Sequence, residues 1–101
     1  MPREKFRTLT EQMFYILLCL KTECCGMDLM ERVGTMTDGR VTVGPGTLYN
    51  LLEQFSEAAM IRETKAEGRR RSYILTELGH QALEREVRRL RKQIEDYERL
   101  P

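Results

Sequence analysis

The stretch Pro45–Phe55, with the sequence PGTLYNLLEQF, predicts an amphipathic helix. Proline is favoured at the first position of a helix, because the N–H that it lacks would have no partner there. The apolar residues then recur at the i, i+3, i+4 and i+7 positions of one helix face. They are Leu48, Leu51, Leu52 and Phe55. The stretch therefore indicates a helix that buries one face and exposes the other.

The exposed face of this helix differs from an ordinary solvated face, which is usually rich in Lys and Glu. It carries Thr47, Tyr49, Asn50, Glu53 and Gln54. Hydroxyl, amide and phenol groups can hydrogen-bond phosphates and base edges, and a helix N-terminus itself favours anions. An ordinary surface helix with a half-buried Tyr49 is the alternative, so the segment that follows decides between the two.

A basic β-hairpin is predicted directly after this helix. Ile61–Lys65 and Ser72–Leu75 read as short strands, and the turn between them contains Gly68 and three arginines. A helix followed by such a hairpin is the layout of a winged helix, whose helix enters the major groove of DNA. The residues predicted to contact phosphates or the minor groove are Arg69, Arg70 and Arg71. A solvated turn is the alternative, and Arg71 can instead belong to the strand and point differently from Arg70.

The combined pattern resembles the PadR family of phenolic-acid-repressor-like transcriptional regulators. The resemblance rests on PGTLY, LLEQF, MIRE and GRRRSYILTELG, in this order. It implies a mainly α fold with a small β-hairpin, namely a winged helix-turn-helix plus a long C-terminal dimerisation helix. Thr47 and Tyr49 are groove-facing by the family's motif. Asn50, which can read adenine, joins them by helical phase, and Gln54 is grouped with them.

The resemblance also implies a function. It points to a dimeric, sequence-specific DNA-binding regulator, a repressor of a palindromic operator that is relieved by a small-molecule effector. The chain departs from the family's usual pattern at two positions. Met27 stands where relatives often have an aromatic residue, and Ala59 stands where they usually have glycine. Because glycine there suits a left-handed helix cap, either Ala59 accepts that backbone conformation or the turn differs.

The chain before this helix predicts two further helices. The first runs to about Lys21 after a polar, loose arm over residues 1–7, with either Thr8 or Thr10 as its N-cap. Its broad apolar surface implies burial on more than one side. In some relatives the effector lies between the first and last helices of the dimer. Phe14 and Tyr15 are therefore the candidates for a pocket that takes a small aromatic or drug-like effector.

The second helix is expected from about Cys25 to Met36, with its apolar side chains inward at Met27, Met30 and Val33 and with Leu29 flanking them. Arg40–Val43 alternates and contains β-branched residues, which predicts a very short strand. That strand would pair with the wing hairpin and complete a three-stranded sheet.

The last helix is predicted from an N-cap at Thr76 to Glu98 or Arg99. Its apolar residues follow a heptad, with β-branched residues at a and mostly leucine at d, a pattern that favours two strands. They are Leu83, Val87, Leu90, Ile94 and Tyr97. This stripe predicts a homodimer, and a helix folded back on its own domain is the alternative. Residues 1–76 are thus assigned to the DNA-binding domain and residues 77–101 to the dimerisation helix, together forming one compact unit.

Length and charge agree with a small regulator. At 101 residues the chain has room for one core. It shows neither an export signal nor an apolar run long enough to span a membrane, so we expect a cytoplasmic protein without a membrane partner. The net charge of +1 excludes a histone-like binder, but basic residues gather between Arg62 and Arg71. Near-neutral charge also leaves open a winged-helix protein-interaction module that does not bind DNA.

The positions of the cysteines and of the histidine predict no cofactor. Cys19, Cys24 and Cys25 are odd in number and lack zinc-ligand spacing, so reduced thiols are expected. A redox switch built on these cysteines is a further alternative, which an oxidant-insensitive DNA affinity would contradict. His80 is the only histidine and has no sequence context for catalysis or for a metal site. The chain is therefore not expected to be an enzyme.

Overall fold

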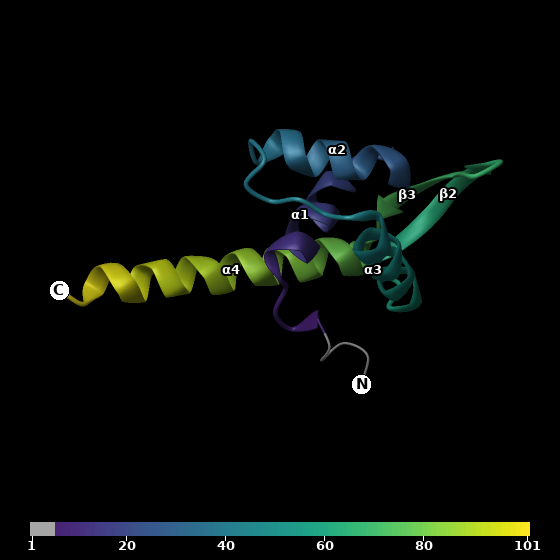
Figure 1. The fold of residues 1–101 in the computed structure, drawn as a ribbon. Coiled ribbons are helices and arrows are strands. Elements are labelled where there is room, and N and C mark those ends of the chain that lie inside the picture. Colours follow the sequence, from purple (N-terminus) through teal and green to yellow (C-terminus); the bar gives the residue numbers. More distant parts are fainter. Residues whose placement is uncertain (1–5) are drawn as a thin grey trace.

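A computed structural model describes residues 6–101, which form four α-helices and one antiparallel sheet of three strands. In chain order the elements are α1 (Glu11–Cys19), β1 (Cys24–Cys25), α2 (Gly26–Met36), α3 (Pro45–Glu57), β2 (Ile61–Glu67), β3 (Arg70–Leu75) and α4 (Glu77–Arg99). The hairpin of β2 and β3 and the free end of α4 lie at opposite ends of the molecule (Figure 1). The predicted winged helix-turn-helix with a long C-terminal helix is confirmed.

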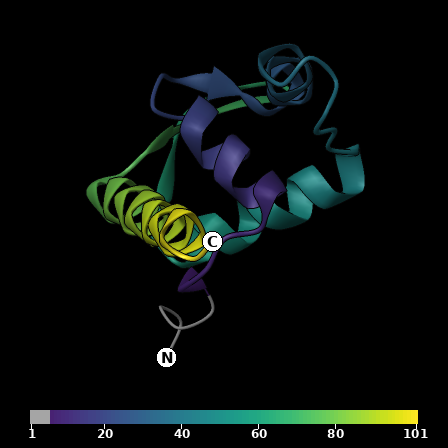
Figure 2. The same cartoon turned by 90° about the vertical axis from the view of Figure 1, so that its left-hand side faces the viewer.

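The inner face of α3 lies at the centre of the core. Its apolar residues are buried as the periodicity predicts, and they are Leu48, Leu51, Leu52 and Phe55. α1 crosses the middle of the body, as the view along α4 shows (Figure 2). Phe6 also enters the core, where its ring centroid lies 5.4 Å from that of Phe55. The predicted loose arm is therefore wrong at Phe6, and residues 1–5 lie outside the described part of the chain.

Side-chain caps set the starts of α1 and α4. Of the two candidate caps for α1, the structure uses Thr10, whose hydroxyl accepts a hydrogen bond from the Met13 N–H at 3.2 Å. Thr76 caps α4 as predicted, accepting from the Gly79 N–H at 3.2 Å. Close packing requires glycine at position 79, because a Cβ there would lie 2.2 Å from the carbonyl oxygen of Met60.

The inward face of α2 differs from the prediction. Leu29 and Val33 are fully buried, whereas Met30 is half-buried and Met27 is 53% exposed. The expectation that Met27 points inward is therefore wrong, and Leu29 is a central core residue. The cause is the position of Gly26, which begins α2 and shares the buried face with Leu29 and Val33 at helical spacing.

The third strand of the sheet comes from an unexpected segment. β1 pairs with β3 through Cys24 opposite Tyr73 and Cys25 opposite Ser72. The predicted strand at Arg40–Val43 is wrong, because this segment is a loop between α2 and α3. Its alternating pattern has another origin, since Val41 and Val43 each place a side chain in the core.

The first turns of α4 belong to the body of the molecule, and the rest of the helix projects from it (Figure 1). Ala82, Leu83 and Glu86 are buried. The side chain of Arg89 donates hydrogen bonds to Glu86, and the backbone of Leu9 donates another; together they hold the pKa of that carboxyl below its ordinary value despite burial. Glu86 thus fastens the segment before α1 to α4. Within residues 6–101, no helix combines the length and apolarity needed to cross a membrane.

The turn after α3 gives a stability test. Ala59 accepts the left-handed conformation, with φ +60°. In the folded state this conformation is about 1–2 kcal/mol less favourable for a non-glycine residue than for glycine. Glycine also increases the conformational entropy of the unfolded chain, which offsets part of the expected gain in stability. We expect Ala59→Gly to raise the free energy of unfolding by roughly 0.5–1 kcal/mol in urea denaturation.

The matched control is Ala58→Gly, because Ala58 has φ −83° and needs no glycine. It should lower the free energy of unfolding. Equal losses in both variants would contradict the strain assigned to Ala59.

Candidate nucleic-acid interface

The N-terminus of α3 is exposed and carries no side-chain cap. Gly44 is its N-cap residue, Pro45 begins the helix, and the first turn contains no acidic residue. The first N–H groups of a helix have no partner within it and form a positive end. A Cβ at Gly44 or Gly46 would meet no atom within 4 Å. The protein's own packing therefore does not require glycine there, and an external group can approach the backbone closely.

The predicted DNA-facing residues of α3 fall on two adjoining faces. Thr47 and Asn50 are exposed on one side, and Gln54 follows them at helical spacing but is half-buried. Tyr49 lies on the other side, toward the wing, and is 47% exposed. Its ring also covers the start of α2, because a Cβ at Gly26 would lie 3.2 Å from its Cε1 atom. Tyr49 is thus partly a packing residue.

An open groove of about 790 Å³ separates α3 from the wing. It brings together both tyrosines of this region, three arginines and two glutamates. These residues are Tyr49, Tyr73, Arg62, Arg69, Arg71, Glu53 and Glu63. Burial, and then the Glu63 carboxylate, raise the pKa of Tyr73, so its phenol stays protonated near neutral pH. Arg62, Glu63 and Tyr73 were not among the predicted interface residues, although the antiparallel pairing of β2 with β3 places Glu63 opposite Tyr73.

The three consecutive arginines of the wing do not act as one group. Gly68 and Arg69 form the turn, where Gly68 has φ +61°, and Arg70 begins β3 opposite Glu67. Arg69 and Arg71 line the groove beside α3. The alternation of β3 then sends Arg70 to the other face of the hairpin, as one of the two alternatives predicted.

Two wing arginines have partners within the chain. An Nη2 atom of Arg70 lies 3.7 Å from Asp28 Oδ2 and 3.5 Å from Cys25 Sγ, which ties the hairpin to the start of α2. Arg71 Nη1 lies 3.7 Å from Glu63 Oε1. Arg69 forms no ion pair with any residue of the described range 6–101. Of the three consecutive arginines, it is therefore the one with the least competition for an external anion.

The two candidate effector residues face different surroundings. Phe14 lines an open groove of about 370 Å³ between α1 and α4, together with Leu18, Lys21, His80, Leu83, Glu84, Val87, Arg88 and Arg91. Tyr15 does not line it. Its hydroxyl instead accepts a hydrogen bond from Arg40 at 2.9 Å. The two rings meet edge-on, with centroids 5.4 Å apart.

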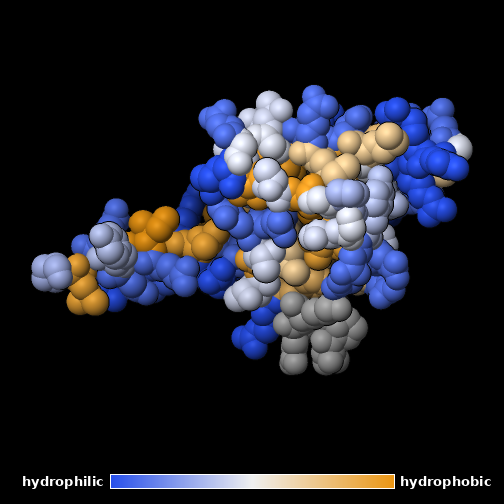
Figure 3. Space-filling model, viewed as in Figure 1, coloured by the Kyte–Doolittle hydropathy of each residue, from blue (hydrophilic) through white to orange (hydrophobic). Residues whose placement is uncertain are grey.

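The predicted dimerisation stripe begins inside the core of the chain and ends on the exposed part of α4. Leu83 is buried within the single chain, and Val87 is half-buried. Beyond them, Leu90, Ile94 and Tyr97 are increasingly exposed, at 37%, 56% and 82%. Figure 3 shows apolar surface along the projecting part of α4. A continuous apolar stripe therefore leaves the core and runs into solvent.

The cysteines and the histidine form no further centre in the described structure. All three thiols are free and buried, and burial raises the pKa of Cys19 and Cys24, so that little reactive thiolate forms. His80 lies on the α1–α4 groove. Residues 6–101 contain no group of three or more side chains placed to hold a metal ion.

A helix with an open N-terminus beside a basic wing defines a winged helix-turn-helix domain of the DNA-binding type. The model of the transcriptional regulator PadR-like family matches residues 16–85, more than half of the chain. The chain therefore belongs to the PadR-like family, whose members are transcriptional regulators rather than enzymes. A search of curated proteins finds no match to the sequence.

Solved structures show the same fold at low sequence identity. A transcriptional regulator from Clostridium thermocellum is 18% identical with a TM-score of 0.75, over 87% of this chain and 90% of that one. A PadR-like transcription factor from Bacteroides fragilis is 22% identical with a TM-score of 0.74, over 89% of both chains. The regulator PcaV from Streptomyces coelicolor, solved with its natural ligand, is 17% identical with a TM-score of 0.70, over 88% and 60%.

Proposed function

We propose that this DNA-binding regulator is a homodimeric repressor that binds a palindromic operator and is released by a small-molecule effector. The observation that carries the proposal is that the exposed start of α3 adjoins a groove lined by two wing arginines. Gly46, Thr47 and Asn50 are exposed on α3, and Tyr49, on the adjoining face of the helix, lines the groove together with Arg69 and Arg71.

The chemistry of this surface matches duplex DNA. The open N-terminus of α3 suits a phosphate, because its N–H groups lack partners and its glycines admit close approach. Thr47 and Asn50 would then meet base edges in the major groove, with Gln54 deeper along the helix. Arg69 and Arg71 would reach phosphates or the minor groove beside it.

The exposed stripe on α4 supports a dimer. Leu90, Ile94 and Tyr97 are exposed on the C-terminal half of α4, the part of the helix that projects from the body (Figure 1). A two-stranded pairing would bury them together with the outer edges of Leu83 and Val87. In a symmetric dimer the two α3 helices would enter major grooves about 34 Å apart, which requires a palindromic site.

The groove between α1 and α4 is the candidate effector site. Phe14 offers it an aromatic face, whereas Lys21, Arg88 and Arg91 give it a basic rim. PcaV, a regulator of similar fold, has been crystallised in complex with its natural ligand. A small aromatic effector, held on Phe14 and near Tyr15, would lie beside the proposed dimer helices.

Two features favour the second candidate, a winged-helix interaction module without DNA binding. The net charge is only +1, and Glu53 and Glu63 line the groove between α3 and the wing. Negative charge there opposes phosphate binding. A DNA titration distinguishes the two functions, because only the regulator binds DNA.

The first test is a fluorescence anisotropy titration against short duplexes that include the protein's own upstream region, at several salt concentrations. We expect one duplex to bind, with an affinity that falls steeply as salt rises. Arg69→Ala should make the slope of log K against log salt less negative by about 0.9, because one phosphate contact is lost. Arg99→Ala, at the far end of α4, is the control and should leave the slope unchanged.

Absence of binding at low salt, from a protein that is folded and dimeric, would contradict the DNA-binding proposal and favour the interaction module.

The second test addresses the open start of α3. Gly46→Ala places a methyl group where the protein leaves free space, so the fold should be retained or slightly stabilised. If a phosphate approaches this backbone, DNA affinity should fall about tenfold, or ~1.4 kcal/mol, with an unchanged salt slope.

Gly34→Ala is the matched control, because Gly34 also has open space around its Cα but lies on α2. Equal DNA affinity of Gly46→Ala and the wild type would argue against phosphate binding at this end of α3.

The third test addresses the dimer. Ile94→Glu puts a charge into the exposed apolar stripe, and each dimer would bury two copies. We expect the dimer dissociation constant from sedimentation velocity to rise at least tenfold, about 1.4 kcal/mol. Lys92→Glu places the same side chain on the opposite face of α4 and should have little effect. A monomeric wild-type protein at high concentration would refute the dimer.

A further inference from the structure

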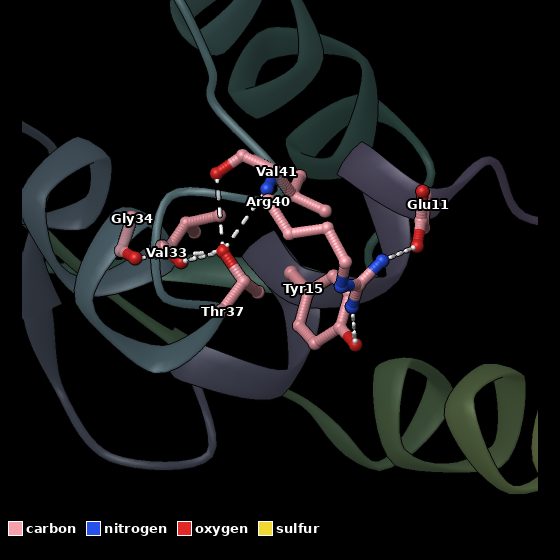
Figure 4. Close-up of polar contacts among 7 residues, drawn as sticks. All are labelled: Glu11, Tyr15, Val33, Gly34, Thr37, Arg40 and Val41. Carbon is pink, nitrogen blue, oxygen red and sulfur yellow. Dashed lines mark hydrogen bonds and ion pairs between the residues drawn. The ribbon is translucent and has the colours of Figure 1, made fainter.

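The loop between α2 and α3 is held to α1 by side chains that lie far away in the sequence. Arg40, in this loop, donates a hydrogen bond from Nη2 to the Tyr15 hydroxyl at 2.9 Å and forms an ion pair with Glu11 (Figure 4). Its guanidinium carbon lies 5.8 Å from the centroid of the Tyr15 ring. Gln12 Nε2 donates to the carbonyl oxygen of Thr42 at 2.8 Å. One face of α1 thus binds the loop at two successive points.

The loop is also hydrogen-bonded to the end of α2. The Thr37 hydroxyl donates to the Val33 carbonyl at 2.8 Å and accepts from the Val41 N–H at 3.1 Å (Figure 4). Val41 and Val43 are buried. The segment between Arg40 and the start of α3 at Pro45 is therefore short and well packed. A displacement of Arg40 would be expected to displace the first turn of α3 as well.

The contact of Arg40 with α1 is unlike a stabilising core contact. The side chains of Arg40 and Glu11 are 57% and 60% exposed, and ion pairs of this kind add little to the stability of a fold. What the contact does fix is geometry, because the guanidinium is held by a carboxylate and a phenol at the same time. Such an arrangement orients a loop more than it stabilises a core.

We propose that Arg40 is a positioning residue: through Tyr15 and Glu11 it fixes the loop before α3, and thereby the phosphate-facing first turn of α3. The proposal rests on the DNA-binding function proposed above. Tyr15 thus belongs to the machinery that aligns the recognition helix rather than to the lining of the α1–α4 groove. Its neighbour Phe14 lines that groove, so consecutive residues of α1 serve the two surfaces.

The test uses full-length Tyr15→Phe, Arg40→Met and the double variant. Tyr15→Phe removes one hydroxyl and keeps the ring contact with Phe14. We expect a three- to tenfold loss of operator affinity in each single variant and an unchanged salt slope, because neither side chain is assigned to a phosphate. The double variant should bind the operator no more weakly than Arg40→Met alone, since both substitutions remove the same contact between Arg40 and Tyr15. The thermal midpoint should stay within about 3 °C of the wild type.

A second readout does not depend on DNA. Hydrogen exchange of the Val41 and Leu48 amides in the free protein should be faster in both single variants, because these amides bond to Thr37 and to the Gly44 carbonyl at the two ends of the loop. Arg99→Met removes a surface arginine that pairs with Asp96 at the end of α4, and it should change neither readout.

The outcomes are distinguishable. Wild-type protein that binds no DNA would refute the proposed function, and amide exchange would still test the positioning role. A salt slope reduced by about one counterion in Arg40→Met, with normal affinity in Tyr15→Phe, would show that Arg40 contacts DNA directly and would overturn the proposal. Wild-type exchange rates in Tyr15→Phe would overturn it as well.

Discussion

The structure depends on the burial of one face of α3. Leu48 and Phe55 have no exposed surface, and Leu51 and Leu52 are nearly as buried. The N-terminal segment, α1, α2 and the sheet all contribute to the core that receives this face, with the Phe6 ring packed at a tilt against that of Phe55. Because a close-packed core leaves no room for rotation, burial of the inner face also fixes which residues the outer face presents. The open N-terminus and the exposed Thr47 and Asn50 are consequences of that packing.

Local signals were enough to predict much of this fold. The apolar period of α3, the glycine and arginines of the wing turn, and the cap at Thr76 act over only a few residues, so the sequence displays them directly. The left-handed residue at Ala59 was one of two predicted alternatives, which came from the resemblance to the PadR family, whose members usually have glycine at this position.

The rest could not be predicted because it depends on distant partners. β1 has only two residues and forms because β3 offers Tyr73 and Ser72 as an open edge. Arg40–Val43 alternates for a different reason, since its two valines enter the core from a loop. At the candidate site the sequence located the arginines at the wing tip and included different directions for Arg70 and Arg71 among its alternatives. The contact of Arg70 with Asp28 could not be predicted, because Asp28 lies far away in the sequence. Tyr15 shares no sequence signal with Arg40, which lies 25 residues further along.

Helix α1 connects the surfaces of the molecule. Its Phe14 side chain forms part of the groove along α4, and the next residue holds the loop before α3. The two rings meet edge-on, so neither can move far without the other. A helix moves nearly as a rigid unit within a packed core, and small shifts of such units are how packed proteins change state. A shift of α1 against α4 would therefore displace Tyr15 from Arg40 unless the loop and the first turn of α3 moved with it. If the groove binds an effector as we propose, its occupation and the alignment of the first turn of α3 would be coupled, because Phe14 and Tyr15 belong to the same short helix.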